Sequence, residues 1–529
     1  MKRTGITAIY LENFKGISEC VKIPLKPITL LFGANSAGKS TIIQAIHYIR
    51  EIILRNNPNA NFTEIGGESI DLGGFNNLIN LHDNSKKITI GFEITPDDDG
   101  IPNYSDMFDI NHQLELGSNY YTHIDINAKV ETFRLDFVVS YDTENQMPWV
   151  SQVKYNINDD DLLDIVVDRY EAKPYISNIN LEHELFNGKL LDEYELEIDS
   201  NFLEVIDYLF DSEKNIRLEY SNTCILSDKY PVIFNYIGTS SGMEIDFKSF
   251  NHFFQQILLG TLSLLKEHIN QFRYLGPIRK IPNRHHIVPS FIDENRWADG
   301  MAAWDLLYNS DFNDDSKDSL ITKVNKYLSE QYTDVGYELT VKEYRELPTD
   351  NIELLGLKKL LVNFEDEDES LLKKFLNSIE GIQVKKRIEL RDINNNIFVR
   401  GKDIGVGISQ VIPVIVGSIS DSKKIFAIEQ PELHLHPKVQ CNLADVFVEE
   451  MNKDNERIFL IETHSEHLVL RLQKLIRNGK LKPEDISIIF VSRDTEGSKV
   501  TTLRLDEEGC FIDSWPGGFF PERRNELRG

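Results

Sequence analysis

The sequence predicts an α/β fold built around a parallel sheet, which a long acidic insertion interrupts. Residues 28–32 form a short apolar run, and a glycine-rich turn and a helical apolar pattern follow it directly, as after a buried parallel strand. Three more apolar runs, at 425–428, 458–461 and 486–491, are separated by helical patterns, and this alternation is typical of βαβ units. Between the two regions, residues 96–270 are acidic, rich in asparagine and less regular.

The first region, residues 1–95, begins with a β-like segment at 6–13. The apolar strand described above comes next, and apolar positions at helical spacing then predict a helix from Ser40 to about Leu54. A strand, a glycine turn and a helix therefore follow one another without a gap. This arrangement is typical of a loop that binds phosphate at the end of a strand.

The second and third regions are residues 96–270 and 271–529. A strand is expected over 133–139 in the second region and a helix over 320–331 in the third. The most periodic piece of the second region is 250–269, which predicts a helix with a broad apolar face. We favour a core helix there, and the alternative is a helix through which two chains dimerise.

Composition limits the class of protein. The 529 residues include 57 Lys and Arg against 85 Asp and Glu, which gives a net charge of −28 and a pI near 4.9. Because phosphate repels such a field, a protein that coats nucleic acid with its whole surface is excluded, although a local basic groove is not. The separated cysteines, Cys20, Cys224, Cys441 and Cys510, argue against a disulfide scaffold or a zinc module. Without a secretory signal or an apolar run near 18 residues, we expect a cytoplasmic protein with no membrane contact.

A glycine-rich motif joins the first apolar strand to its helix. Residues 33–40 read GANSAGKS, a complete GxxxxGK[ST] phosphate loop, and a threonine follows. In such loops backbone N–H groups surround phosphate oxygens, the lysine reaches the β- and γ-phosphates, and the serine hydroxyl ligates Mg²⁺. We therefore predict that ATP and Mg²⁺ bind here, in contact with Gly33, Asn35, Ser36, Ala37, Gly38, Lys39, Ser40 and Thr41.

A second element is needed to hold the metal ion. The apolar run at 425–428 delivers Glu429 at its carboxyl end, where open α/β sheets place their ligands. We assign Mg²⁺ to Glu429 and Ser40, with the carboxylate acting directly or through a bound water. The next apolar run leads to His464, whose imidazole can hydrogen bond a γ-phosphate and so report its presence.

The order of these motifs resembles the ABC-type ATPase heads of structural-maintenance (SMC), RecF-like and OLD-like proteins. Residues 11–16, LENFKG, are similar to the start of such heads, and the resemblance implies that Lys15 lies near the nucleotide phosphates. Residues 403–410 stand where the family carries its signature motif, which closes on the γ-phosphate held by a second protomer. The resemblance makes His464 the switch histidine and implies a homodimer or a higher homo-oligomer. It assigns the contact with the partner's nucleotide to Gly407, Ser409 and Gln410.

Three further stretches narrow the likeness. Residues 274–279 (YLGPIR), 429–437 (EQPELHLHP) and 513–520 (DSWPGGFF) are similar to bacterial AAA family ATPases with a DUF3696-type C-terminus. Relatives with this architecture are ATPase subunits of anti-phage defence systems such as the Septu, retron-associated and PARIS systems. The resemblance implies that the chain senses infection and controls a separately encoded effector through ATP-dependent head dimerisation. That effector would be an HNH or Toprim-like nuclease, in some systems together with a retron element.

On this interpretation residues 1–95 and 271–529 are the two lobes of an ABC-type P-loop ATPase head. Residues 96–270 are then an inserted α+β region that serves oligomerisation or partner binding. The residues after His464 read as two strands and a Trp-Pro tail, whereas OLD-like nucleases append a domain of acidic metal ligands after the head. We therefore expect a separate polypeptide to supply any cleavage of nucleic acid.

One position departs from the family pattern. Many ABC heads carry a glutamate directly after the metal acid, where it orients or deprotonates the attacking water, but this chain has Gln430. A positioned general base contributes about 10²–10⁴-fold in rate, so we predict slow ATP hydrolysis and a long-lived closed dimer. Glu432, two residues further on, is the candidate substitute for the missing base.

Several assignments stay open at the level of sequence. His434 and His436 form a pair at metal-ligand spacing without an evident third ligand. Residues 279–296 contain the densest basic stretch, which suits a solvated or ATP-sensing face as well as a nucleic-acid contact. The alternatives to the defence role are a RecF-like DNA-repair ATPase that clamps DNA when ATP is bound and a scaffold that binds ATP without hydrolysing it.

Overall fold

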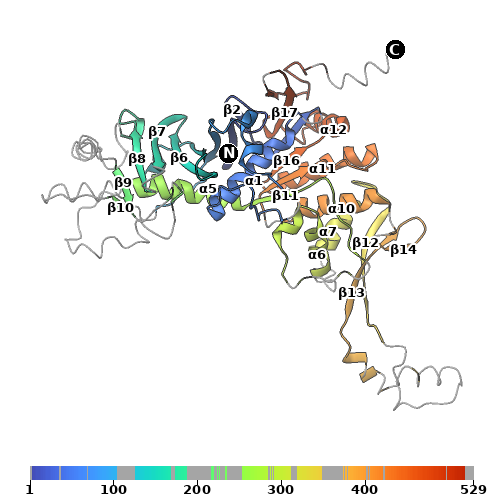
Figure 1. Cartoon of the computed structure of the whole chain (residues 1–529). Coiled ribbons are helices and arrows are strands. Elements are labelled where there is room, and N and C mark those ends of the chain that lie inside the picture. The colour runs from blue at the N-terminus through green and yellow to red at the C-terminus, as the bar shows by residue number, and fades with distance from the viewer. Residues whose placement is uncertain are drawn as a thin grey trace, which may run out of the picture.

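A computed structural model of the chain places a six-stranded sheet at the centre, a nine-stranded sheet on one side and a three-stranded arm that projects from the body (Figure 1). The structure describes residues 3–34, 37–67, 70–103, 126–167, 173–186, 216–219, 223, 225–226, 233–234, 253–283, 286, 289, 291–310, 319–347, 355, 373, 376–377, 379–400, 403, 405–420, 423–495, 497–516 and 518.

The central sheet has the strand order β11-β15-β16-β3-β17-β18. Its first five strands pair in parallel, and β18 joins antiparallel to β17. The strands are apolar because both faces of the sheet are covered, and all four apolar runs predicted as parallel strands are confirmed. Their bounds are β11 (Phe272–Leu275), β15 (Ile425–Glu429), β16 (Ile458–Glu462), β3 (Ile28–Gly33), β17 (Ile486–Arg493) and β18 (Ser498–Leu503).

Helices cover both faces of this sheet because successive side chains of a strand point to opposite sides. Leu30 and Phe32 of β3 face one core, which contains residues of α6, α7, α10, α11 and α12. Leu31 faces the other core, which contains residues of α1 and of the nine-stranded sheet. The bounds are α1 (Lys39–Arg55), α6 (Met301–Asn309), α7 (Leu320–Leu328), α10 (Val406–Ile419), α11 (Pro437–Lys453) and α12 (Glu466–Arg477).

The nine-stranded sheet is antiparallel, with the order β10-β9-β8-β7-β6-β5-β4-β1-β2. β4 ends at Thr95 and pairs with β5, so the sheet runs without a break from the predicted N-terminal lobe into the predicted insertion. A separate role for that insertion stays a proposal. The bounds are β1 (Gly5–Glu12), β2 (Val21–Pro24), β4 (Ile88–Thr95), β5 (Phe133–Asp142), β6 (Met147–Ile157), β7 (Asp160–Val167), β8 (Pro174–Ile179), β9 (Ile216–Glu219) and β10 (Ile233–Phe234).

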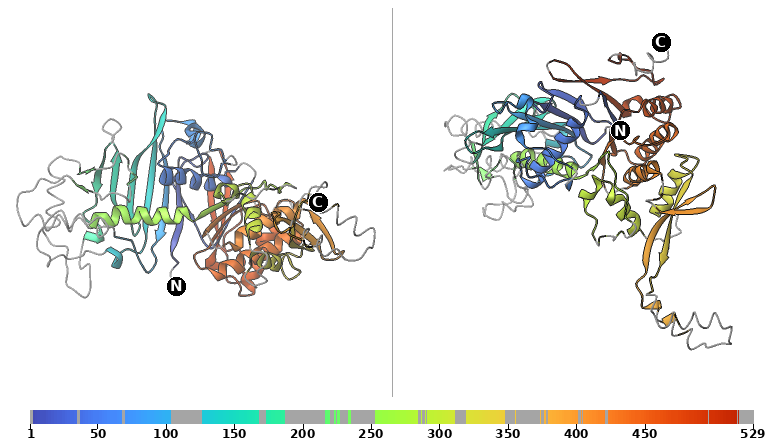
Figure 2. Two further views of the ribbon diagram at one scale, coloured as in Figure 1. Left: turned by 90° about the horizontal axis from the view of Figure 1, so that it is seen from below. Right: turned by 45° about the vertical axis from the view of Figure 1, so that its right-hand side comes forward.

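A long helix crosses the strands of the nine-stranded sheet (Figure 2, left). It contains a π-helical turn, η6 (Gln256–Gly260), that continues into α5 (Thr261–Asn270). Phe253, Phe254 and Leu265 are fully buried in the core that this helix shares with the sheet. The apolar face predicted over 250–269 is therefore a core face and is not available for dimerisation in the folded chain.

The projecting arm consists of β12 (Tyr337–Tyr344), β13 (Lys385–Asp392) and β14 (Ile397–Arg400), all antiparallel (Figure 1). Within the part of the chain that the structure describes, no helix combines the length and the apolar character that a membrane crossing requires. The remaining short elements are α2 (Phe75–Leu78), η2 (Asn80–His82), η4 (Ile126–Ala128), η5 (Glu184–Phe186), η7 (Glu294–Trp297) and η9 (Pro483–Asp485).

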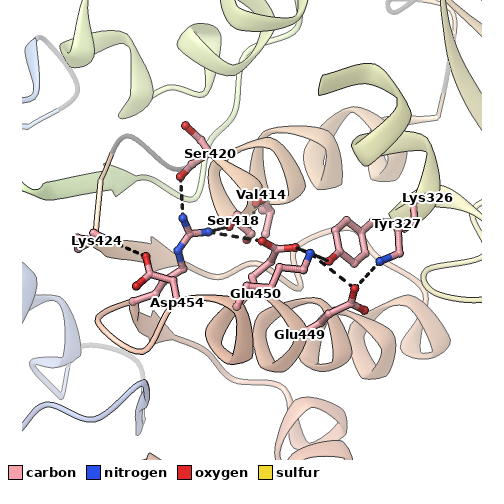
Figure 3. Close-up of polar contacts among 11 residues, drawn as sticks. Lys326, Tyr327, Val414, Ser418, Ser420, Lys424, Glu449, Glu450 and Asp454 are labelled. Carbon is pink, nitrogen blue, oxygen red and sulfur yellow. Dashed lines mark hydrogen bonds and ion pairs between the residues drawn. The ribbon is translucent and has the colours of Figure 1, made fainter. Parts of the chain in front are cut away.

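A buried polar network fixes α10 to its neighbouring helices (Figure 3). Arg457 is 2% exposed, and its guanidinium donates to the carbonyl oxygens of Ser418 and Ser420 at the C-terminal end of α10. Glu450 of α11 lies 3.6 Å from Arg457 and accepts a hydrogen bond from the Tyr327 hydroxyl of α7. Because the loss of one partner would leave a buried charge uncompensated, this network holds α7, α10 and α11 in one arrangement.

Candidate functional site

The phosphate loop lies between the carboxyl end of β3 and the first turn of α1. Gly33 has a φ of +150°, and a Cβ there would lie 2.1 Å from the carbonyl oxygen of Val491 on β17. Gly38 has a φ of +108° directly before α1. Both positions therefore require glycine. Ala37 is buried next to them, whereas Asn35 and Ser36 lie outside the described residues.

Lys39 is folded back onto its own loop. Its ammonium donates hydrogen bonds to the carbonyl oxygens of Gly33, at 3.1 Å, and Ala34, at 2.9 Å. The residue is 4% exposed, and this burial lowers its pKa, which the carboxylate of Glu462, 4.0 Å away, raises in turn. A phosphate oxygen is a stronger acceptor for an ammonium group than a neutral carbonyl is, so a nucleotide would displace these contacts.

The Ser40 hydroxyl contacts a carboxylate that the sequence analysis did not assign. It donates a 2.7 Å hydrogen bond to Oε2 of Glu462, the last residue of β16. β15 and β16 are parallel neighbours, and their register sets Glu429 beside Glu462. The sequence carries a signal for this residue, because Glu462 ends an apolar strand as Glu429 does and the carboxyl ends of parallel strands meet at one edge.

Glu429, the predicted metal acid, ends β15 at the same edge. Burial and the nearby charge of Glu462 raise the pKa of Glu429 to about 7, although a hydrogen bond from the Tyr274 hydroxyl acts in the opposite direction. Burial also raises the pKa of Glu462. The backbone carbonyl of Glu429 accepts a 2.7 Å hydrogen bond from the guanidinium of Arg279. Two neighbouring carboxylates that resist joint ionisation favour a cation beside them.

The oxygen atoms of these side chains are suitable ligands for a magnesium ion. Mg²⁺ prefers oxygen ligands and is commonly bound with nucleotides through one or two carboxylates, phosphate oxygens and several waters. The hydroxyl of Ser40 and the carboxylates of Glu429 and Glu462 supply such oxygens at one edge of the sheet. Among the described residues, no group of three or more His, Cys, Asp or Glu side chains is arranged to hold a metal ion alone. Nucleotide and water would therefore complete the coordination of the ion.

Hydrogen bonds join the segments that follow β15 and β16. Gln430 has a φ of +47°, and its backbone N–H donates to the carbonyl oxygen of Glu462 at 2.7 Å. Glu432 accepts from the Thr463 hydroxyl at 2.7 Å and from the backbone N–H of His464 at 2.8 Å, one through each carboxylate oxygen. Glu432 thus positions the loop that carries the exposed His464. In this arrangement Glu432 is engaged as a support, so the geometry gives no backing to the prediction that it replaces the missing base.

One family matches the sequence over most of its length. The AAA ATPase domain family covers residues 5–469, which include the phosphate loop, both carboxylate strands and the loop of His464. The chain belongs to the AAA ATPase domain family. Residues 481–528 of this AAA ATPase match a second family, described as a protein of unknown function, DUF3696, which confirms the predicted C-terminus. A comparison with curated proteins found no match.

The solved structures that match this chain include SMC heads. The head of an SMC protein bound to the C-terminal winged-helix domain of ScpA is 12% identical, with a TM-score of 0.36, and the match covers 95% of this chain and 98% of that one. An SMC head with an extended coiled coil, bound to the C-terminal domain of ScpA and derived from Pyrococcus furiosus, is 13% identical with a TM-score of 0.35, at coverages of 99% and 100%. The SMC head domain from Thermotoga maritima is 9% identical with a TM-score of 0.34, at coverages of 95% and 99%.

The residues predicted to form the signature motif lie at the start of α10, but the serine among them does not face solvent. Ser409 is 2% exposed, and its hydroxyl donates to the carbonyl oxygen of Val406 at 2.7 Å. Gln410 is also buried, and its amide donates to the carbonyl oxygen of Arg279 at 2.8 Å. A hydroxyl inside the first turns of a helix readily bonds back to its own backbone, which sequence spacing does not reveal. The exposed residues at this helix start are Gly405 and Val406.

Gly407 packs against the loop that follows β15. A Cβ at this position would lie 2.7 Å from the carbonyl oxygen of His434, so the close approach requires glycine. His436 caps α11, since its ring accepts from the backbone N–H of Lys438 at 3.3 Å. Both histidines are exposed, and neither belongs to a metal-binding cluster in the described parts of the chain.

Two contacts brace the phosphate loop from outside. Lys15 donates to the side-chain oxygen of Gln44 on α1 at 2.5 Å, about one helical turn beyond the loop. The hydroxyl of Ser498, at the start of β18, donates to the carbonyl oxygen of Ala37 at 2.8 Å. The backbone N–H of Ser498 donates to the carbonyl oxygen of Gly16 at 2.6 Å. Sequence reasoning missed Ser498, because it lies 461 positions from Ala37 in a hairpin without a recognisable motif.

Much of the basic stretch is committed to internal contacts. Arg279 is buried, and its guanidinium donates to the carbonyl oxygens of Glu429 and Gln430, at the end of β15. Arg296 and His286 both bind the buried carboxylate of Asp305, at 2.7 Å and 2.8 Å. Lys280 lies 2.9 Å from a carboxylate oxygen of Asp299. These partners give the four residues structural roles. Two further members of the stretch lie outside the described residues, Arg284 and His285.

Proposed function

We propose that this AAA ATPase binds ATP with Mg²⁺ at the phosphate loop, hydrolyses it slowly and pairs with a second head while ATP is bound. The observation that carries the proposal is the contact of Lys39 and Ser40 with the carboxylate of Glu462, which the strand register sets beside Glu429. The lysine would bind the β- and γ-phosphates, and the serine and carboxylates would hold the metal ion. When bound, the ion would neutralise charge on the phosphates and stabilise the transferring group.

Slow hydrolysis follows from the residue after Glu429. The amide of Gln430 cannot accept a proton from the attacking water, although it can orient the water through its carbonyl oxygen. Glu432 is the nearest substitute along the chain, and both of its oxygens are bound to the loop of His464. A site with its metal acids and without a free general base suits a switch that stays ATP-bound for a long time.

Head pairing is supported by the exposed start of α10. Gly405 and Val406 face solvent there, and a Cβ added at Gly405 meets nothing within 4 Å. The backbone N–H groups at a helix start attract a phosphate, so this surface could close on the γ-phosphate of a second protomer. Arg279 joins α10 to the end of β15 within one head, which would couple such closure to the metal acids.

We further infer that the chain is the ATPase subunit of an anti-phage defence system and controls a separately encoded effector nuclease. The DUF3696-type C-terminus supports this role, because ATPases of such systems share it. The net charge of −28 suits recognition of a basic partner protein rather than of nucleic acid. The DNA-clamping alternative loses part of its candidate surface, since Arg279 and Arg296 are bound within the chain.

Phage challenge of cells that carry the complete system tests this function. Lys39→Ala should abolish nucleotide binding and protection, because the loop then lacks its cation for phosphate. Gly405→Arg should retain nucleotide binding and lose pairing and protection, because a long side chain would fill the proposed contact. Gly405→Ala is the matched control, since its methyl group meets open space. Full protection by the Lys39→Ala variant would refute the proposed function.

A further inference from the structure

Glu462 is a buried carboxylate that faces the phosphate loop. Its side chain accepts the hydrogen bond from the Ser40 hydroxyl at 2.7 Å, and its other oxygen lies 4.0 Å from the ammonium of Lys39. Only 5% of the residue is exposed. Glu462 therefore interacts with Lys39 and Ser40, the two side chains of the loop that a nucleotide and its metal ion would contact.

A purely structural role does not explain a carboxylate at this position. An uncharged acceptor would satisfy the Ser40 hydroxyl without the cost of a buried charge. The charge also lies among like charges, because the carboxylates of Glu429 and Glu432 act on the same lysine as Glu462 does. The three carboxylates around Lys39 already carry more negative charge than the lysine can neutralise. The phosphates of ATP would increase this excess unless a cation accompanied them. The site is thus suited to a divalent ion.

The two acids of the edge differ in what their carboxylates contact. The carboxylate of Glu429 is hydrogen bonded to the Tyr274 hydroxyl, on the β11 side of β15. The carboxylate of Glu462 lies on the next strand and is bonded to Ser40, the residue that phosphate loops use for the metal ion. Of the two, Glu462 is therefore the one already in contact with a metal-binding group of the loop.

We propose that Glu462 is a metal-side acid of the nucleotide site that exchanges partners. Without nucleotide it binds the Ser40 hydroxyl and attracts Lys39, which keeps both side chains in place. With ATP and Mg²⁺ it releases the hydroxyl to the metal ion and becomes a carboxylate ligand of that ion or of its bound water. This inference rests on the proposed binding of ATP with Mg²⁺ and assigns a residue that the phosphate-loop motif does not contain.

The exchange gives two effects of opposite sign in a Glu462→Gln variant. Glutamine keeps the shape and an acceptor for Ser40, so the loop should remain folded. Metal-free nucleotide should bind at least about threefold more tightly, because a negative charge beside Lys39 has gone. Mn²⁺ should bind the complex with ADP about tenfold or more weakly, a loss in the range seen when a supporting metal-site residue is removed. A merely structural residue would not separate these two affinities.

The test uses the full chain as wild type, Glu462→Gln and Glu456→Gln. Glu456 precedes β16 at the opposite end of the same strand and pairs with Lys424, so its variant removes a carboxylate away from the site. Fluorescent ADP is titrated in EDTA, and Mn²⁺ is then titrated into the ADP complex while free Mn²⁺ is followed by electron paramagnetic resonance. Nucleotide binding in EDTA also reports that each variant is folded.

The outcomes separate this inference from the proposed function. Weaker Mn²⁺ binding together with tighter metal-free ADP binding in Glu462→Gln, and neither change in Glu456→Gln, is the expected result. Unchanged Mn²⁺ affinity in Glu462→Gln, with a wild type that binds Mn²⁺ and ADP together, would overturn the role of Glu462 alone. A wild type that binds no Mn²⁺ with ADP would overturn the proposed metal-dependent function itself. If Glu462→Gln does not fold, Glu462→Asp, which keeps the charge, must bind Mn²⁺ more tightly than Glu462→Ala for the inference to stand.

Discussion

Replacement of Glu429 by glutamine should stabilise the metal-free protein. Burial and the charge of Glu462 raise the pKa of Glu429 from 4.5 to about 7, so the folded state holds this proton more tightly than the unfolded chain. The stability that the proton contributes is complete below pH 4.5 and is lost as the pH rises through about 7. At pH 8 the wild type therefore carries an ionised, poorly solvated carboxylate. The neutral amide of the Glu429→Gln variant would avoid this charge and would still accept from the Tyr274 hydroxyl.

The size of the effect follows from the pKa. One pKa unit corresponds to about 1.4 kcal/mol, so a rise from 4.5 to about 7 costs the wild type about 3 kcal/mol at pH 8. At pH 5.5 the folded protein keeps the proton, and the cost falls to about 1 kcal/mol. A domain of 150–250 residues gains roughly 2–4 °C per kcal/mol and a longer chain gains less, so we expect a rise of roughly 3–6 °C at pH 8.

Thermal unfolding in EDTA at pH 8 and pH 5.5 measures the stability difference between Glu429→Gln and the wild type at each pH. The exposed carboxylate of Glu456 provides the control, because Glu456→Gln should change the apparent Tm little at either pH. Addition of Mg²⁺ with ADP should reduce or reverse the difference in apparent Tm between the Glu429→Gln variant and the wild type, since a bound metal ion would stabilise the wild-type carboxylate. If Glu429→Gln were no more stable than the wild type at pH 8, or if its gain at pH 5.5 were as large, the electrostatic reasoning would be wrong.

Three further predictions concern hydrolysis, the loop that carries His464 and head pairing. Gln430→Glu restores a general base and should speed single-turnover ATP hydrolysis by about tenfold or more, and an unchanged rate would show that the base is not limiting. Glu432→Ala removes two hydrogen bonds to a carboxylate and leaves the Thr463 hydroxyl without its acceptor, so urea unfolding should show a loss of about 2–4 kcal/mol. A loss below about 1 kcal/mol would contradict the role of Glu432 as a support of His464. Gly405→Arg should prevent ATP-dependent dimerisation in light scattering while Gly405→Ala does not, and equal dimerisation by both would exclude the start of α10 from the contact.

The sequence alone was sufficient for the parallel strands and the phosphate loop. Apolar runs such as 28–32 and 458–461 are buried on both faces, and that burial is why they lack the alternation of a half-exposed strand. The helix after Gly38 and the position of Glu429 at the carboxyl end of β15 follow from local motifs in the same way. These features depend on residues close together in the chain, so pattern and spacing define them.

The remaining features depend on contacts between distant segments. Ser409 belongs to the predicted signature motif, but whether its hydroxyl points to solvent or to the carbonyl of Val406 is decided by how α10 packs. The contact of Glu462 with Ser40 joins residues 422 positions apart and requires the register of β16 beside β3. The continuous sheet across Thr95 likewise arises from pairing of β4 with β5, which no composition change reveals.

Single-turnover ATP hydrolysis tests the central claim most directly. ATP is mixed with an excess of the protein and Mg²⁺, and the rate is compared between the wild type and Gln430→Ala. We predict tight ATP binding followed by turnover well below the roughly 10 s⁻¹ of a median enzyme, because no free carboxylate follows Glu429 to deprotonate water. A rate constant of tens per second that the Gln430→Ala substitution does not lower would contradict the account of a slow switch that stays bound to ATP.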